Sequence, residues 1–444
     1  MIKYLTLSLL LSSVKAFLAV PNIQFLSTEF YDHDKNYNLR IIKNEIKKCE
    51  HSESINLDNM NLYILKNKLI QSKNIQHISL YDNHLEDIYT ILDYVPSLIC
   101  LNLSRNEINI YNNNIIRHSY LQVLDLSYQK ISEVRDLEET NDIYKYMKFN
   151  SIEISLPNLQ YLDLSGNDIS TLLWDFYLSF PKLVQLDLIN IKAVELEPMF
   201  FNKIPKTLRV LHLENNNLQN LTLRDMTEVT ALYLDGNKNL QIINIASKRL
   251  KILSLSKCPN INDGILDTPY LEQLDLSMNN LKSVSNISFE IFPTLRILLL
   301  DYNELSHIPV LNTLQQLDEL SLSFNMIKNI PSTSFTYFPS LKKLSLKGNK
   351  IERIEKDSFF GLNDLEYLNL SDNKLKGLPY NWATSLINLR YLNANSNQFA
   401  NILDLAINSN IISLQHLSVK NNLITKMSTL ELAHLPNATI VYVT

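Results

Sequence analysis

The stretch LEYLNLSDNKL, residues 365–375, decides the fold. Leucines stand at its first, fourth, sixth and eleventh positions, and an asparagine, Asn373, stands at its ninth. Because side chains alternate between the two faces of a strand, the fourth and sixth leucines share one face of a short strand. We expect the asparagine to turn the chain out of that strand, and its amide to hydrogen bond the backbone of neighbouring coils.

The same eleven-residue template occurs fifteen times. The copies begin at Ile75, Leu98, Leu121, Leu159, Leu183, Leu208, Val229, Leu250, Leu271, Leu295, Leu317, Leu341, Leu365, Leu389 and Leu414. Successive starts are 21 to 25 residues apart, except for one step of 38 residues after Leu121. Twelve copies keep the asparagine, and we expect Gln129, Ile191 and Cys258 to interrupt the ladder. A repeat of this period predicts a solenoid in which each coil packs only on its neighbours.

This pattern resembles the leucine-rich repeat family over about residues 50–444, and the phrase SFFGL from Ser358 is typical of animal extracellular members. The resemblance implies an α/β solenoid, a horseshoe with a parallel β-sheet on its concave face and loops or short 3₁₀ turns on its convex face. The chain also resembles insect leucine-rich immune proteins and Toll-like or chaoptin-like ectodomains. That likeness implies a protein partner and, for the immune proteins, pairing through cysteines.

The ends of the array predict three parts. Residues 1–16 have a positive start, an apolar run and a small-residue cleavage position, the layout of a secretory signal peptide; a signal anchor or a buried first element is the alternative. Residues 17–54 form a flanking or capping segment, and residues 55–444 form the repeat domain, with an insertion of about 14 residues within 132–158. Further strands are expected at Ser54–Leu57 and Val441–Val443. No later apolar run reaches about 18 residues, so we expect a secreted chain without stable membrane insertion.

Composition excludes several classes of function. The 444 residues carry 41 Lys and Arg against 46 Asp and Glu, a net charge of −5, which argues against nucleic acid as a partner. The six glycines are never closer than 13 residues, so no glycine-rich phosphate loop can be written. No HExxH, GxSxG or cysteine-protease signature and no metal-ligand spacing occurs. The sequence therefore predicts a protein that is not an enzyme and that needs no cofactor or metal.

The three cysteines are Cys49, Cys100 and Cys258. An odd number leaves at least one thiol free or paired with another chain. Cys258 replaces a ladder asparagine and is expected in the core. Cys100 stands at an outward strand position, so it and Cys49 are equal candidates for an intermolecular disulfide.

Five Asn-x-Ser/Thr triplets are candidates for N-glycosylation. They lie at Asn102, Asn220, Asn286, Asn369 and Asn437.

The strand period turns the third and fifth positions of each copy toward the concave face. Acidic and aromatic side chains recur there and in the turn that follows. The acids are Asp125, Asp163, Asp187, Asp235, Asp275 and Asp301, and the aromatic residues are Tyr302, Phe324, Tyr367 and Tyr391. The acids are either structural or a patch for a basic partner or a divalent cation, and exposed aromatic rings are common anchors of protein interfaces.

These observations predict a secreted, non-enzymatic recognition protein that binds an extracellular protein ligand or receptor on its concave face, with a role in innate immunity. Homo- or heterodimers would fit the cysteine count. The alternative is a structural cell-adhesion or matrix protein that associates with itself.

Overall fold

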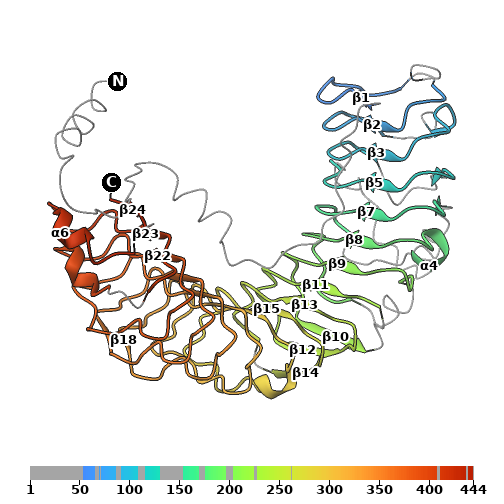
Figure 1. Cartoon of the computed structure of the whole chain (residues 1–444). Coiled ribbons are helices and arrows are strands. Elements are labelled where there is room, and N and C mark those ends of the chain that lie inside the picture. Colours follow the sequence, from blue (N-terminus) through green and yellow to red (C-terminus); the bar gives the residue numbers. More distant parts are fainter. Residues whose placement is uncertain are drawn as a thin grey trace, which may run out of the picture. The chain divides into compact units, whose positions relative to one another are not determined.

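The computed structural model describes residues 54–65, 70, 72–86, 92–108, 116–130, 154–169, 176–196, 204–224, 228–261, 263–407, 411–436 and 439–443. These residues fall into two compact units. Figure 1 labels their helices and strands. The N-terminal unit holds residues 54–304 and 311–321, and the C-terminal unit holds residues 305–310 and 322–443. The predicted signal peptide, most of the capping segment and most of the insertion lie outside the described residues.

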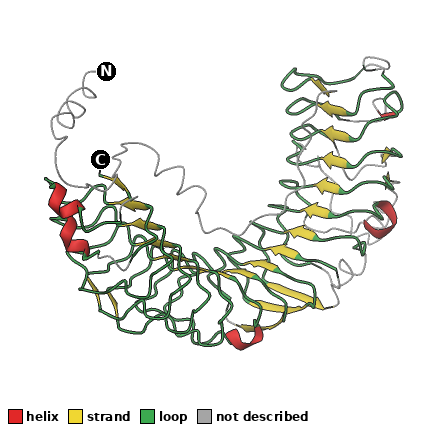
Figure 2. Ribbon diagram, in the orientation of Figure 1, coloured by secondary structure: helices red, strands yellow, loops and turns green. Residues whose placement is uncertain are grey.

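The N-terminal unit contains a main sheet in which each strand pairs in parallel with the next coil's strand (Figure 2). Its strands are β1 (Ser54–Asn56), β2 (His77–Ser79), β3 (Cys100–Asn102), β5 (Val123–Asp125), β7 (Tyr161–Asp163), β8 (Gln185–Asp187), β9 (Val210–His212), β11 (Ala231–Tyr233), β13 (Ile252–Ser254), β15 (Gln273–Asp275), β16 (Ile297–Leu299) and β17 (Glu319–Ser321). The strand expected near Ser54 is present as β1. Strand β5 pairs directly with β7, so the long step between their coils does not interrupt the sheet.

The C-terminal unit repeats this arrangement. Its strands are β19 (Lys343–Ser345), β21 (Tyr367–Asn369), β22 (Tyr391–Asn393), β23 (His416–Ser418) and β24 (Ile440–Tyr442), each parallel to the next. The last strand lies one residue earlier than the sequence predicts. The parallel solenoid predicted from the repeat is therefore confirmed.

The core consists of the repeated apolar positions. In the copy that starts at Leu341, the first, fourth, sixth and eleventh side chains (Leu341, Leu344, Leu346 and Ile351) are all fully buried. Removing this much apolar surface from water is the main favourable contribution to folding.

The side of each coil away from the main sheet contains more strand than the sequence predicts. The N-terminal unit has a three-stranded parallel sheet of β10 (Asn220–Arg224), β12 (Ile242–Ala246) and β14 (Asp263–Asp267), and the pair β4 (Ile116–Arg117) and β6 (Ile154–Ser155). The C-terminal unit has the pair β18 (Asn329–Ile330) and β20 (Arg353–Ile354). The expected short 3₁₀ turns occur at η2 (Phe289–Ile291) and η3 (Ile402–Leu405). Two short α-helices, α4 (Phe176–Ser179) and α6 (Thr429–Leu432), were not predicted.

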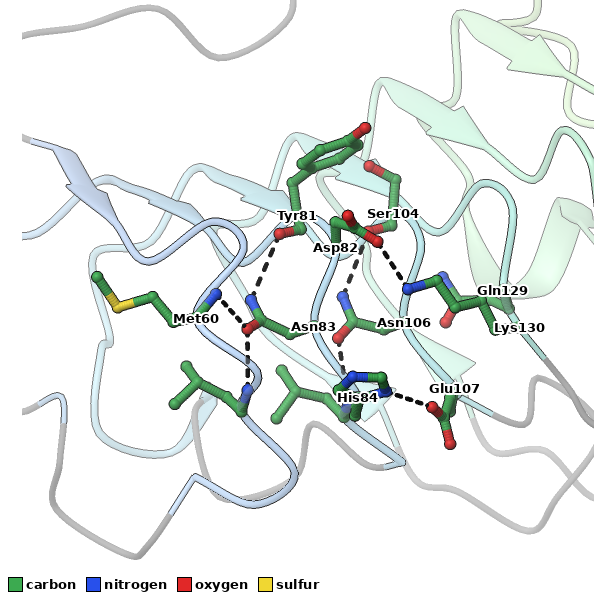
Figure 3. Close-up of polar contacts among 12 residues, drawn as sticks. Met60, Tyr81, Asp82, Asn83, His84, Ser104, Asn106, Glu107, Gln129 and Lys130 are labelled. Carbon is green, nitrogen blue, oxygen red and sulfur yellow. Dashed lines mark hydrogen bonds and ion pairs between the residues drawn. The ribbon is translucent and has the colours of Figure 1, made fainter.

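The ninth-position asparagines form the predicted ladder (Figure 3). Asn106 is fully buried; its Nδ2 donates to the carbonyls of Leu80 (2.9 Å) and Leu103 (3.0 Å), and its Oδ1 accepts from the backbone N–H of Leu85 (3.0 Å). One amide therefore satisfies groups in two coils, which matters because an unpaired buried backbone group is costly.

Two of the three expected interruptions are wrong. Gln129 accepts from the N–H of Ile108 (2.9 Å) and donates to the carbonyl of Leu103 (2.9 Å), because its longer amide reaches the same groups. The thiol of Cys258 donates to the carbonyl of Leu234 (3.3 Å). Only Ile191 places an apolar side chain at this position, so the side-chain ladder is interrupted there alone among the described copies.

Candidate functional site

The eighth position of each copy is a left-handed turn that sequence reasoning missed. Tyr128, Tyr302 and Phe324 have φ values of 54°, 54° and 55° there, and Gly166 and Gly348 occupy the same position in other coils. The only signal in the sequence is the glycine, asparagine and aspartate that recur at this position, since these residues tolerate positive φ best. A Cβ atom on Gly348 would clash with the ring of Phe324, so that ring packs directly against the backbone of the next coil.

The acids at the fifth position cap the ends of their strands. Asp125 accepts from the N–H (3.0 Å) and hydroxyl (2.6 Å) of Ser127, and Asp163 accepts from the N–H of Ser165 (2.9 Å). Asp125, Asp163 and Asp187 lie on adjacent strands at matching register positions. All three are at most 7% exposed, which favours the structural alternative over a binding patch for these carboxylates.

Asp187 lies at the centre of this group. Tyr161 donates its hydroxyl to Asp187 Oδ2 (2.8 Å), and Gln185 donates its amide to Oδ1 (3.0 Å). His212 Nε2 lies 3.9 Å from Oδ1, which is too far for a hydrogen bond. Burial raises the pKa of Asp187 to about 6, although the nearby His212 opposes that rise.

His212 continues the polar row toward the next coils. Its Nδ1 lies 2.9 Å from Glu214 Oε1, and its ring stacks on Tyr233 at 4.5 Å between centroids. His212 is 2% exposed. Its contacts with Glu214 and Tyr233 account for the burial of the imidazole, and no catalytic role is needed to explain it. The row is a buried polar network that fixes side-chain positions.

Three of the predicted acids remain half-buried on the sheet face of the N-terminal unit. Asp235 accepts from the N–H of Ser256 (3.0 Å) and the hydroxyl of Ser254, and Asp301 accepts from the hydroxyl of Ser321. Asp275 accepts from the N–H of Ser277 (2.8 Å). In the part of the chain that the structure describes, no three His, Cys, Asp or Glu side chains are placed to hold a metal ion.

We expect Asp275→Asn to stabilise the protein at pH 7 and to leave its stability unchanged at pH 4. Burial, together with the charges of Asp235 and Asp301, raises the folded pKa of Asp275 to about 6, against the hydrogen bonds from Ser277 that lower it. An unfolded aspartate titrates near pH 4 (about 3.9), so the folded state binds more protons between about pH 4 and pH 6, and stability falls as pH rises through this window. The amide removes that loss, which is at most about 3 kcal/mol for a shift of about two pKa units. Urea midpoints at both pH values test this, and an equal shift at both would contradict it.

The predicted aromatic residues differ in exposure. Tyr302 is 49% exposed in the N-terminal unit. In the C-terminal unit Phe324 is half-buried, with the Lys347 ammonium 5.8 Å from its ring centroid and 3.7 Å from the carboxylate of Asp372. These rings keep an accessible surface, as an interface anchor requires.

Tyr367 and Tyr391 lie side by side on strands β21 and β22. Tyr367 is 3% exposed, so its predicted exposure is wrong. Tyr391 is half-buried and stacks on His416 (4.7 Å between centroids), which in turn stacks on Tyr442 (6.0 Å). The three rings form a continuous row across the last three strands.

The prediction of an intermolecular disulfide at Cys100 assumed that its sulfur is exposed, and this assumption is wrong. Cys100 is 1% exposed and already takes part in a disulfide bond, so its sulfur is not available on the surface to another chain. Cys49 lies outside the described residues. Cys258 is a buried free thiol whose pKa burial raises to about 12, as the prediction of a core cysteine requires.

The glycosylation candidates differ in the exposure of their side chains. Asn220 and Asn286 are exposed, Asn102 is half-buried and Asn369 is buried. Asn437 lies outside the described residues. Among the described residues, no helix has the length and apolar character needed to cross a membrane.

Comparison with known proteins supports the repeat assignment. A family model described as "Leucine rich repeat" matches residues 269–327, 293–351, 315–375 and 339–399, and a second model of that description matches residues 158–178. Toll-like receptor 2 of Ovis aries is 37% identical over 293 residues, which is 60% of this chain and 35% of the relative. Toll-like receptor 9 of Mus musculus is 27% identical over 222 residues, which is 47% of this chain and 18% of the relative.

Another similar protein is the oligodendrocyte-myelin glycoprotein of Homo sapiens, 26% identical over 169 residues, 37% of this chain and 34% of the relative. The chain thus spans only 18% to 35% of the length of these three relatives.

Two solved structures share the fold. The TLR13–ssRNA13 complex matches with a TM-score of 0.55 and 19% identity, covering 83% of this chain and 62% of the other. A leucine-rich repeat protein of Leptospira interrogans matches with a TM-score of 0.54 and 22% identity, covering 94% of this chain and 99% of the other. Together with the stacked coils and the asparagine ladder, these matches identify the chain as a leucine-rich repeat protein whose repeats resemble those of Toll-like receptors.

Proposed function

We propose that the chain is a secreted, non-enzymatic recognition protein that binds a basic extracellular protein through the sheet face of its repeats. The observation that carries this proposal is the exposed ring of Tyr302, which directly follows Asp301. Asp275, one coil earlier, and Asp235 are half-buried on the same unit, so three carboxylates accompany the ring on this sheet face.

The chemistry of this surface fits a protein partner. Tyrosine supplies large contact area with few rotamers to freeze, and it is enriched among residues that dominate binding energy. Carboxylates beside it complement Lys or Arg side chains, which speeds association and rejects acidic partners. A half-buried carboxylate attracts a cation more strongly than a fully solvated one does, because the effective dielectric constant around it is lower.

The similarity to Toll-like receptors supports an innate-immune role for this binding. The RNA in the TLR13–ssRNA13 complex does not transfer, since that likeness extends to the fold alone. A net charge of −5 also opposes binding to phosphate-rich chains. Self-association in a matrix is the competing function.

Tyr302→Ala combined with Phe324→Ala is expected to abolish partner capture without lowering the melting temperature. Both rings are partly exposed, so their loss removes contact area and leaves the leucine core intact. Loss of an anchor of this kind costs about 2 kcal/mol or more, roughly 30-fold in affinity. The measurement is the amount of protein retained from extracellular medium by the immobilised chain.

Tyr120→Ala with Tyr337→Ala is the matched control, because these rings are 63% and 48% exposed elsewhere on the two units. Equal capture by both double variants would refute the assigned surface. If the wild-type chain captured nothing and instead formed larger oligomers with rising concentration, the matrix function would replace this proposal.

A further inference from the structure

The structure separates the glycosylation sequons that the sequence could not rank. Asn102 and Asn369 occupy the fifth position of their copies, on strands β3 and β21 of the main sheets. Asn220 opens strand β10 of the separate three-stranded sheet, and Asn286 lies in the turn before η2. The four sites therefore lie on two different sides of their coils.

The two main-sheet asparagines already have a structural role. Asn102 Oδ1 accepts from the N–H (3.0 Å) and the hydroxyl (2.6 Å) of Ser104, the third residue of its own sequon. Asn369 Oδ1 accepts from the N–H of Ser371 (3.0 Å), and its Nδ2 lies 3.3 Å from the Tyr367 hydroxyl. These bonds end the strand in the same way as those of Asp125 and Asp163, so the amides serve as strand caps.

Space around Asn369 is also closed. Its register partners are Ser345 on one side and Asn393 on the other, and all three side chains are 7% exposed or less. Parallel strands lie about 4.8 Å apart, which leaves no room for a sugar ring on the Nδ2 atom between them. Asn102 lies between Ser79 and Asp125, and Asp125 is 6% exposed, so a glycan there would have to displace a packed neighbour.

Asn220 and Asn286 present the opposite environment. Both side chains are exposed, and so are Thr222 and Ser288, the hydroxyl residues of their sequons. Neither amide hydrogen bonds to any residue that the structure describes, so a sugar on Nδ2 would break no bond. A bulky, solubilising group fits such a surface.

From this contrast we infer that N-glycans are carried at Asn220 and Asn286 and not at Asn102 or Asn369. This inference rests on the proposed secretion. It goes beyond the proposed function by assigning which side of the N-terminal unit is covered by sugar. The sheet face that holds Asp235, Asp275 and Tyr302 stays clear for a partner, while the three-stranded sheet that contains Asn220 is shielded from one.

The test maps glycan occupancy on the full chain secreted by animal cells. The glycans are removed enzymatically in heavy-oxygen water, which converts each modified Asn to a labelled Asp, and the peptides are identified by mass spectrometry. Label is expected at positions 220 and 286 and absent at 102 and 369. Thr222→Ala and Ser288→Ala should each remove one glycan from the intact mass, whereas Ser371→Ala should remove none.

A second chain, in which residues 1–16 are replaced by the cleavable leader of another secreted protein, separates the two hypotheses. If only this second chain is exported, and it shows label at 220 and 286 alone, the predicted leader fails and the site assignment stands. Label at 102 or 369 in folded, secreted protein overturns the assignment whatever the leader does. Absence of label at both 220 and 286 in the exported second chain also overturns it.

Discussion

Replacing Asn373 with alanine should lower the stability of the C-terminal unit by about 3–5 kcal/mol, because three backbone groups lose their buried partner at once. Asn373 Nδ2 donates to the carbonyls of Leu346 (2.9 Å) and Leu370 (3.0 Å), and Oδ1 accepts from the N–H of Ile351 (3.0 Å). Water cannot replace the amide, since the site is 7% exposed and the surrounding leucines are fully buried. Each unsatisfied group costs about 1–3 kcal/mol.

The loss should be local as well as large. In a solenoid each coil contacts only its neighbours, so the damage falls on the coils that Asn373 connects. Amide hydrogen exchange should therefore accelerate over residues 341–399 and remain unchanged over residues 228–261. Asn388→Ala is the matched control, because its exposed Nδ2 makes a single bond to the carbonyl of Asn363 (2.9 Å). A uniform rise in exchange across both segments, or an equal effect of the two variants, would contradict the ladder's role.

Asn373 also shows why so much of the fold could be predicted. The position of every leucine and asparagine in the template follows from strand alternation and from the need to pair backbone groups, both of which are local rules. Fifteen copies then fix the register of each strand against the next, so the parallel sheet follows from the period alone. The same local rules located the first strand at Ser54 and the last near Val441.

The binding residues were harder to predict from the sequence. Strand alternation gives the face toward which a side chain points, but not how much of that side chain is exposed. Asp163 points to the predicted face, yet Tyr161 and Asp187 pack around it and leave it 5% exposed. Burial there depends on how side chains of the same coil and of the next coil pack together, which strand alternation does not give. The predicted exposure of Cys100 was wrong for the same reason, since its side chain is also buried.

The predictions for the substituted ladder positions were wrong in a different way: they expected a lost hydrogen bond where the structure keeps one. Gln129 and Cys258 differ from asparagine in shape, but each still carries a donor that reaches a carbonyl of the preceding coil. Hydrogen-bonding capacity, not residue identity, is therefore the better predictor at this position. The three-stranded sheet of β10, β12 and β14 was not predicted, because its residues lie outside the eleven-residue template of their copies.

Phe359→Ala should cost about 3–5 kcal/mol, the range for removing a well-packed buried phenylalanine. The Phe359 ring is 1% exposed and lies between two others from adjacent coils. It stacks on Phe335 at 5.6 Å and meets Trp382 edge-on at 5.6 Å between centroids. Aromatic pairs of this geometry contribute about 0.5–1.5 kcal/mol beyond their buried area, so both contacts add to the loss.

The neighbouring residue offers the sharpest control for this prediction. Phe360 differs from Phe359 by one position and is 56% exposed, so Phe360→Ala removes the same atoms from the surface and should change stability by less than about 0.5 kcal/mol. Phe359→Leu retains most of the volume and should cost less than about 1.5 kcal/mol. Urea midpoints give the order of the three variants. If Phe359→Ala and Phe360→Ala lost stability equally, the row of rings would not connect the three coils, and the leucines alone would have to hold them together.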